Sequence, residues 1–297
     1  MDQGSRTAQA LNWALAERDV PGVATRKVCD SLVKLLGPAG SSASTQVSRA
    51  AETLEAGLAA GRERPLDATP YRFLEARYER VRAGGQWVAG AVRVAVGMTA
   101  DGPRRGRGVS VALCEAEVHG RACLDRLLRR GLKGVKRLVS DAHAGLKAAR
   151  RAVFPSVPWQ RGQCHVQQNA QADVTRLDQS KPVARRIRSI DNAPDRAEAE
   201  RLLRQAIEAG KTAMPKLAQG AEDHLPEGFA VFALPHAQRV RLRTTHGRER
   251  INRDIQRRTR VASILPNPAS CLRLVSAWLA ECDEAWMTGK IYLNLNP

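Results

Sequence analysis

The sequence of 297 residues lacks the features that mark several common classes of protein. No apolar run is long enough to cross a bilayer, and residues 1–6 hold no apolar core of a signal peptide. The six cysteines form no Cys-x-x-Cys pair, which argues against a disulfide framework. No internal repeat or low-complexity tract is evident. We therefore expect a cytoplasmic protein with reduced thiols and no membrane partner.

Acidic residues are scarce beside the basic ones. Lysine and arginine total 48 against 30 for aspartate and glutamate, so the net charge is +18 and the pI is about 10.6. A surplus of this size favours a polyanionic partner, with nucleic acid as the first candidate. Arginine dominates the basic set, and its planar fork matches phosphate geometry. A GC-rich genome would also raise the arginine content, but it would not account for the sign of the net charge.

The length suggests roughly two domains, and the N-terminal region reads as helical. Two segments with helical spacing, 23–36 and 45–58, are separated by the Gly37–Gly40 turn. Helix, short turn and helix is the helix-turn-helix pattern, so residues 1–62 are predicted to bind DNA. The polar residues at the start of the second helix would contact phosphates and base edges: Ser44, Thr45, Gln46, Ser48 and Arg49. An ordinary helical hairpin fits the same pattern equally well.

After a linker at 61–67 the periodicity changes to that of strands. Strands are expected at 71–78, 87–98, 108–113, 135–140 and 157–160, with helices at 115–130 and 146–153. Three meander strands followed by strand, helix and strand is the order of a ribonuclease-H-like mixed sheet in an α/β fold. The catalytic core would then span 68–170 and 236–262, with a helical insertion at 171–235 and a C-terminal helix in 263–297.

Three carboxylates are candidates for one site. Asp141 stands where a short apolar strand ends and a helix begins, which is where open α/β sheets place chemistry. In a ribonuclease-H-like sheet the first strand lies beside the fourth, so Glu75 would be next to Asp141. Glu249 opens a later helix, on which it shares a face with Asn252, Arg253 and Gln256.

Carboxylate oxygens suit Mg²⁺, and two such ions would activate a nucleophile and stabilise a leaving oxygen at a phosphodiester, with Mn²⁺ as an alternative metal. Ordinary roles also fit these residues. Asp141 would then be a helix N-cap, Glu75 an exposed strand charge, and Glu249 an ion-pair partner of Arg253. From spacing alone these ordinary roles are favoured.

Four segments together resemble the mutator-type transposases of bacterial insertion sequences: 73–82, 139–146, 154–161 and 244–253. The resemblance implies a DDE transposase with a ribonuclease-H-like core, a helical insertion before the third acidic residue, and Mg²⁺-dependent cleavage and transfer of DNA strands. It implies Glu75, Asp141 and Glu249 as metal ligands and catalytic residues. It also implies double-stranded DNA partners (terminal repeats and target), a homodimer on the DNA, and association with the bacterial nucleoid.

The chain departs from the family pattern at several positions. The family has Asp where Glu75 stands, and a Cys-x-x-His pair where this chain has Gly162 and His165, with Cys164 displaced. His246 replaces the usual Asn, and the beginning is short for the family, so a shortened or degenerate copy is expected. The alternative function is a catalytically inactive DNA-binding remnant. A further alternative is a helix-turn-helix regulator with an unrelated α/β domain, in which the three carboxylates would lie far apart.

Three further features of the sequence admit more than one interpretation. Nine arginines between 239 and 260 predict a surface that follows phosphates, and we assign DNA binding to Arg248, Arg250, Arg253, Arg257 and Arg258. Cys164 and His165 have no second Cys/His pair at ligand spacing, so a structural role is favoured over zinc. Trp159 is expected in the core, with stacking on an unpaired base as its alternative.

Overall fold

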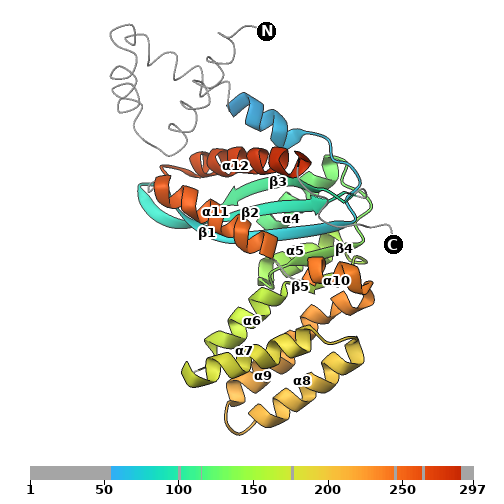
Figure 1. Ribbon diagram of the computed structural model, residues 1–297. Coiled ribbons are helices and arrows are strands. Elements are labelled where there is room, and N and C mark those ends of the chain that lie inside the picture. The colour runs from blue at the N-terminus through green and yellow to red at the C-terminus, as the bar shows by residue number, and fades with distance from the viewer. Residues whose placement is uncertain are drawn as a thin grey trace, which may run out of the picture.

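A computed structural model describes residues 55–99, 102–114, 116–174, 177–243, 246–262 and 265–288, which form a mixed α/β structure (Figure 1). The predicted helix-turn-helix residues lie outside these ranges, so their role stays a prediction. Within the described part, no helix is both long and apolar enough to cross a membrane.

The first three strands form the expected antiparallel meander. They are β1 (Tyr71–Ala83), β2 (Gln86–Met98) and β3 (Arg104–Ala112), with β1 pairing β2 and β2 pairing β3. The turn between β1 and β2 is Gly84-Gly85, whose φ angles of 56° and 81° are accessible to glycine without strain. This tight turn lets β1 run to Ala83, further than the predicted 71–78.

Two short parallel strands complete the sheet. They are β4 (Arg137–Ser140) and β5 (Trp159–Arg161), and the strand order is β3-β2-β1-β4-β5. The first strand therefore lies beside the fourth, as predicted, and the ladder between them ends at the pair Leu74 and Ser140. The connections are helical: α4 (Glu117–Arg129) precedes β4, and α5 (Ala144–Val153) follows it.

Both faces of the sheet are covered by helices. On one face, α4 and α5 pack Leu124 and Leu146 against Leu74, Ala95 and Leu138. On the other face lie α11 (His246–Ala262) and α12 (Pro268–Thr288), which bury apolar side chains against β1, β2 and β3 (Figure 1). Burial on both sides explains why β2 reads as a nearly continuous apolar run.

A separate helical body lies below the sheet in Figure 1. It contains α6 (Gln163–Ala172), α7 (Leu177–Asp191), α8 (Arg196–Gly210), α9 (Pro215–His224) and the 3₁₀ helix η2 (Leu225–Ala233). The next helix, α10 (His236–Arg243), returns to the sheet, where its Leu242 packs with Phe73 and Val139. Asp195 caps α8 as its sequence turn predicts, since its Oδ1 accepts from the Glu198 amide at 2.9 Å. Ile190, Phe229 and Val231 belong to its own hydrophobic core.

Candidate metal and nucleic-acid site

Glu75 and Asp141 lie side by side where the β1–β4 ladder ends. The register pairs Leu74 with Ser140, so Glu75 on β1 lies beside Asp141, the first residue after β4. Side chains alternate along a strand, so Glu75 lies on the face on which Phe73 and Val139 pack together. His165 is near both carboxylates and places Asp141 at the same site. The residue Glu75 is only 3% exposed, whereas the Asp141 side chain is 36% exposed. The interpretation of Glu75 as an exposed strand charge is therefore wrong.

Asp141 is not the N-cap of the helix that follows it. α5 begins at Ala144 after His143, and the Asp141 Oδ1 accepts a hydrogen bond at 2.6 Å from the amide of its neighbour Ala142. The carboxylate is thus held in the turn after β4, where its other oxygen, Oδ2, faces His165.

His165 lies between the two carboxylates. Its Nε2 is 4.0 Å from Glu75 Oε2, and its Nδ1 is 3.9 Å from Asp141 Oδ2. Both distances exceed a hydrogen bond, so the imidazole neighbours the carboxylates without bonding to either. The sequence favours a structural role for His165 and does not predict that it lies between Glu75 and Asp141. The signal that would have found it is its place in the first turn of the helix that follows β5, at the same end of the sheet as Asp141.

α11 reaches the same site through Asn252. The Asn252 side-chain amide donates to Glu75 Oε2 at 3.5 Å. The Arg77 guanidinium donates to the backbone carbonyl of Asn252 and pairs through Nε with Glu79 at 2.5 Å. β1 therefore holds α11 through Glu75 and Arg77, and Glu79 pairs with Arg77 on the same face of the strand. Glu249 precedes Asn252 by three residues on this helix, but its side chain lies outside what the structure describes, so its role as a ligand stays a prediction.

Positive charge lies on the other side of Asp141. The buried Arg161 places Nε 3.9 Å from Asp141 Oδ1 and Nη1 3.3 Å from Glu227 Oε2. Lys147 of α5 also pairs with Glu227. Two cations, Arg161 and Lys147, thus share Glu227, and Arg161 also lies beside Asp141.

Trp159 is half-buried rather than free to stack on a base. Its indole nitrogen donates to Ser140 Oγ at 2.9 Å, and it packs against the core formed by α4 and α5. Lys147 and Arg150 lie over its ring, with 5.1 Å and 5.4 Å to the centroid. The expectation of a core role agrees with this packing.

Two side chains of the site have the chemistry that Mg²⁺ needs. Glu75 and Asp141 supply carboxylate oxygens at the same site, which are the ligands that Mg²⁺ prefers. Among the described side chains, no group of three or more His, Cys, Asp or Glu is arranged to hold a metal ion. A complete ligand set therefore requires a group beyond those side chains, and Glu249 is the predicted one.

The predicted DNA-binding arginines of α11 divide into two kinds. Arg253 and Arg257 are exposed. Arg258 instead forks onto Glu281 of α12, with Nη1 3.1 Å from Oε1 and Nη2 on Oε2, so it joins the two helices. The side chains of Arg248 and Arg250 lie outside the described set.

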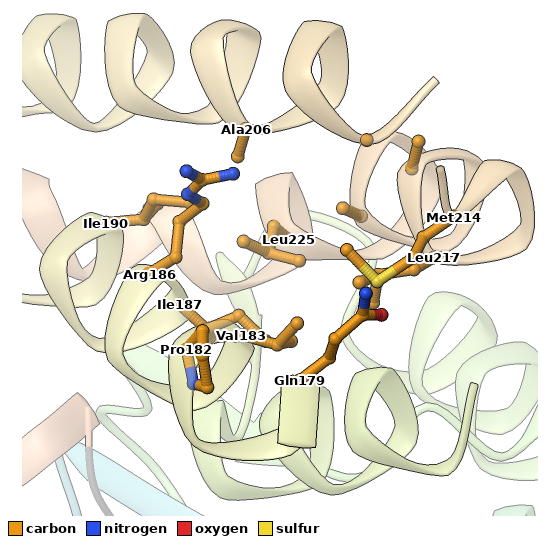
Figure 2. Close-up of a pocket in the computed structure, with 13 residues that line it drawn as sticks. Gln179, Pro182, Val183, Arg186, Ile187, Ile190, Ala206, Met214, Leu217 and Leu225 are labelled. Atoms are coloured by element: carbon orange, nitrogen blue, oxygen red, sulfur yellow. The ribbon is translucent and has the colours of Figure 1, made fainter. Parts of the chain in front are cut away.

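The helical body contains an apolar cavity of about 300 Å³ between α7, α8 and α9 (Figure 2). Val183, Ile187, Met214 and Leu217 are among the side chains directed into it, and Arg186 also lines it. Neither Glu75 nor Asp141 lines this cavity, so it is separate from the carboxylate site.

Comparison with known proteins identifies similar chains. A family model described as transposase, Mutator family, matches residues 1–289. The transposase for insertion sequence element IS406 of Burkholderia multivorans is 60% identical over 297 residues, covering 100% of this chain and 76% of that protein. The ISRM5 transposase of Rhizobium meliloti is 37% identical over 292 residues, covering 98% and 73%. A chain from a simian T-cell lymphotropic virus intasome structure has 11% identity and a TM-score of 0.22, over 61% of this chain and 62% of that one, which is too weak to assign a fold.

Proposed function

Since this chain belongs to the Mutator family of transposases, we propose that it binds the terminal repeats of an insertion sequence and catalyses Mg²⁺-dependent cleavage and transfer of DNA strands. The observation that carries the proposal is the pair formed by Glu75 on β1 and Asp141 at the end of the neighbouring β4, with α11 packed against Glu75. A regulator with an unrelated α/β domain is excluded by the family, and its carboxylates would have lain far apart.

A ribonuclease-H-like core of the DDE type is part of this proposal. It is supported by the strand order β3-β2-β1-β4-β5, in which three antiparallel strands are followed by two parallel ones joined through α5. The long helical segment between β5 and α11 is the proposed insertion before the third acidic residue, Glu249.

The proposed ligands of two Mg²⁺ ions are Glu75, Asp141 and Glu249. When bound, the metal would activate a water or a 3′-hydroxyl and stabilise the leaving oxygen in an in-line displacement. The protein's own residues would orient the carboxylate ligands and attract the phosphodiester. Asn252 fixes Glu75 Oε2, and Arg161 adds positive charge beside Asp141, where a phosphodiester would approach.

The proposed partner is double-stranded DNA, as terminal repeat and as target. Binding is assigned to the exposed arginines Arg253 and Arg257 of α11 and, as predictions from the sequence, to Ser44, Thr45, Gln46, Ser48, Arg49, Arg248 and Arg250. A homodimer assembled on the two ends, in the bacterial cytoplasm at the nucleoid, completes the proposal.

A second candidate function is favoured by one specific residue. Glu75 stands where the family has Asp, and its extra methylene moves the carboxylate outward in a position that is 3% exposed. Mg²⁺ tolerates little geometric error. The chain would then be a catalytically inactive remnant that still binds DNA.

The two candidates differ in a nicking assay. A terminal-repeat duplex is incubated with Mg²⁺ and either the protein, the Glu75→Asp variant or the Asp141→Asn variant. Nicking by the protein and its loss in Asp141→Asn would support the transposase. Nicking by Glu75→Asp alone would support the remnant. Binding of the duplex by the protein and by Glu75→Asp, with nicking by neither, would also support it. Failure of the protein and of Glu75→Asp to bind the duplex would overturn both candidate functions.

A further inference from the structure

The outer half of the β1–β2 hairpin exposes two aromatic rings. Tyr78 is 51% exposed and Trp87 is 50% exposed, whereas most apolar side chains of the sheet are buried. Residues alternate between faces along a strand, and Arg77 and Glu79 face α11. Tyr78 therefore lies on the opposite face, away from the carboxylate site. Val88 packs on the α11 side, so Trp87 shares the face of Tyr78.

Two arginines lie on this same face. Arg80 and Arg82 alternate with Glu79 and Val81, and both are exposed. Neither forms a salt bridge with any described side chain, as is also true of the exposed Arg253 and Arg257 on α11. β2 contains no acidic residue. The hairpin face, which we define as Tyr78, Arg80, Arg82 and Trp87, is thus positive and aromatic.

We propose that the hairpin face binds single-stranded DNA. Guanidinium groups suit the phosphates, and exposed aromatic rings stack on unpaired bases of any sequence. Arg82 pairs directly with Trp87, and Tyr78 lies four residues earlier on β1. At about 3.3 Å per residue the two rings are separated by about 13 Å along the hairpin, so they contact different bases. The source of the strand rests on the proposed function, because cleavage at an element end would expose unpaired bases.

A second copy of this chain is the competing occupant. Exposed aromatic side chains also occur at interfaces between proteins. In a two-fold dimer through this face, however, the same patch on each copy meets the other, so two pairs of arginines would be brought together with no acidic side chain from β2 between them. The positive charges of these arginines would repel one another across the interface. The charge therefore favours DNA.

The test is fluorescence anisotropy of a labelled single-stranded oligonucleotide, without divalent metal, beside a duplex of the same sequence. Tyr78→Ala and Trp87→Ala should each weaken single-strand binding about tenfold. Arg80→Gln with Arg82→Gln should weaken it and lower its salt dependence. Matched controls are Met287→Ala and Arg196→Gln, exposed residues on α12 and α8, which should leave it unchanged. Oligonucleotide should also quench tryptophan fluorescence more in the unaltered protein than in Trp87→Phe.

Three outcomes would overturn the proposal. One is single-strand affinity unchanged in the aromatic variants. The second is an equal loss of duplex affinity, which would mean a general phosphate surface. The third is loss of a dimer in sedimentation with single-strand affinity intact, which would assign the face to a second copy. Trp87→Phe keeps a ring at this position, so its retained binding guards against variants that fail to fold. The binding assay needs no metal, so it is independent of the nicking assay. Absence of nicking would contradict the proposed strand cleavage and leave the result on single-strand binding unchanged.

Discussion

The side-chain amide of Asn252 lies 3.5 Å from Glu75 Oε2, joining α11 to β1 across 177 residues of sequence. This contact makes α11, which comes late in the chain, part of the same site as the first strand, β1. Ile251 and Ile255, on either side of Asn252, are buried against the sheet in the core shared with α12. The position of Glu75 Oε2 therefore depends on how firmly α11 is seated.

Asn252→Ala should remove the donor that orients Glu75. The free energy of unfolding should fall by about 1 kcal/mol, because a buried acceptor loses a hydrogen bond. Urea denaturation measures this change. Gln256→Ala, one turn further along the same helix, is the control, since Gln256 has no assigned contact with Glu75. An equal loss in Gln256→Ala would mean that the effect does not come from the contact with Glu75.

Arg77→Met should loosen α11 from β1. The substitution removes the donor to the Asn252 carbonyl and leaves Glu79 without its 2.5 Å partner. Hydrogen exchange followed by mass spectrometry should show faster exchange across residues 246–262, with a loss of about 1–3 kcal/mol in local stability. Arg80→Met, on the opposite face of the same strand, should leave that exchange unchanged. Equal exchange in both variants would show that Arg77 does not seat the helix.

How far the sequence predicts this site depends on which interactions are local. The alternation in 71–83 and 86–98 predicts the hairpin, and strand order alone predicts Glu75 beside Asp141. The burial of Glu75 was not predicted because it depends on α11, which comes far later in the chain. The position of His165 depends on the direction in which α6 leaves β5. The pairing of Arg258 with Glu281 depends on the packing of two helices, and composition alone assigned this arginine to DNA.

Arg72→Met should preserve or raise stability. Arg72 is fully buried on β1, and none of its guanidinium nitrogens has a hydrogen-bond partner among the described residues. Burial, with Arg107 nearby, lowers the pKa of Arg72 to about 9. Replacing a buried unpaired charge by an apolar side chain of similar length removes a desolvation cost, so the free energy of unfolding should rise by about 1 kcal/mol. Thermal and urea unfolding measure it.

Arg130→Met is the matched control for that substitution. Arg130 is also buried, but it donates to the carbonyls of Arg64 and Arg107 at 2.8 Å and 2.6 Å. Its removal leaves two acceptors without their donors, so stability should fall by about 1–3 kcal/mol. A loss of stability in Arg72→Met as large as in Arg130→Met would show that the Arg72 charge is compensated.

Cys271 should make stability fall at alkaline pH. Burial, reinforced by Glu79, raises the pKa of the Cys271 thiol to about 12, above its ordinary value of 9.0. The folded state then binds a proton that the unfolded state releases, so this contribution is complete below pH 9 and is lost as pH rises toward 12. The slope would be at most about 1.4 kcal/mol per pH unit. Unfolding measured from pH 8 to 11 should lose this slope in Cys271→Ala, and persistence of the slope would assign it to other groups.

Arg253→Gln and Arg257→Gln should weaken binding of duplex DNA more than Arg258→Gln does. The first two side chains are exposed on α11, so each can reach a phosphate, whereas Arg258 is already engaged by Glu281. Removing one arginine–phosphate pair should reduce the slope of log affinity against log salt by about 0.9. Arg258→Gln should instead lower thermal stability and leave the salt slope unchanged, because it breaks a link between helices. Titrations at several salt concentrations separate the two effects. A reduced slope in Arg258→Gln alone would mean that DNA displaces Glu281 and that the exposed pair does not bind it.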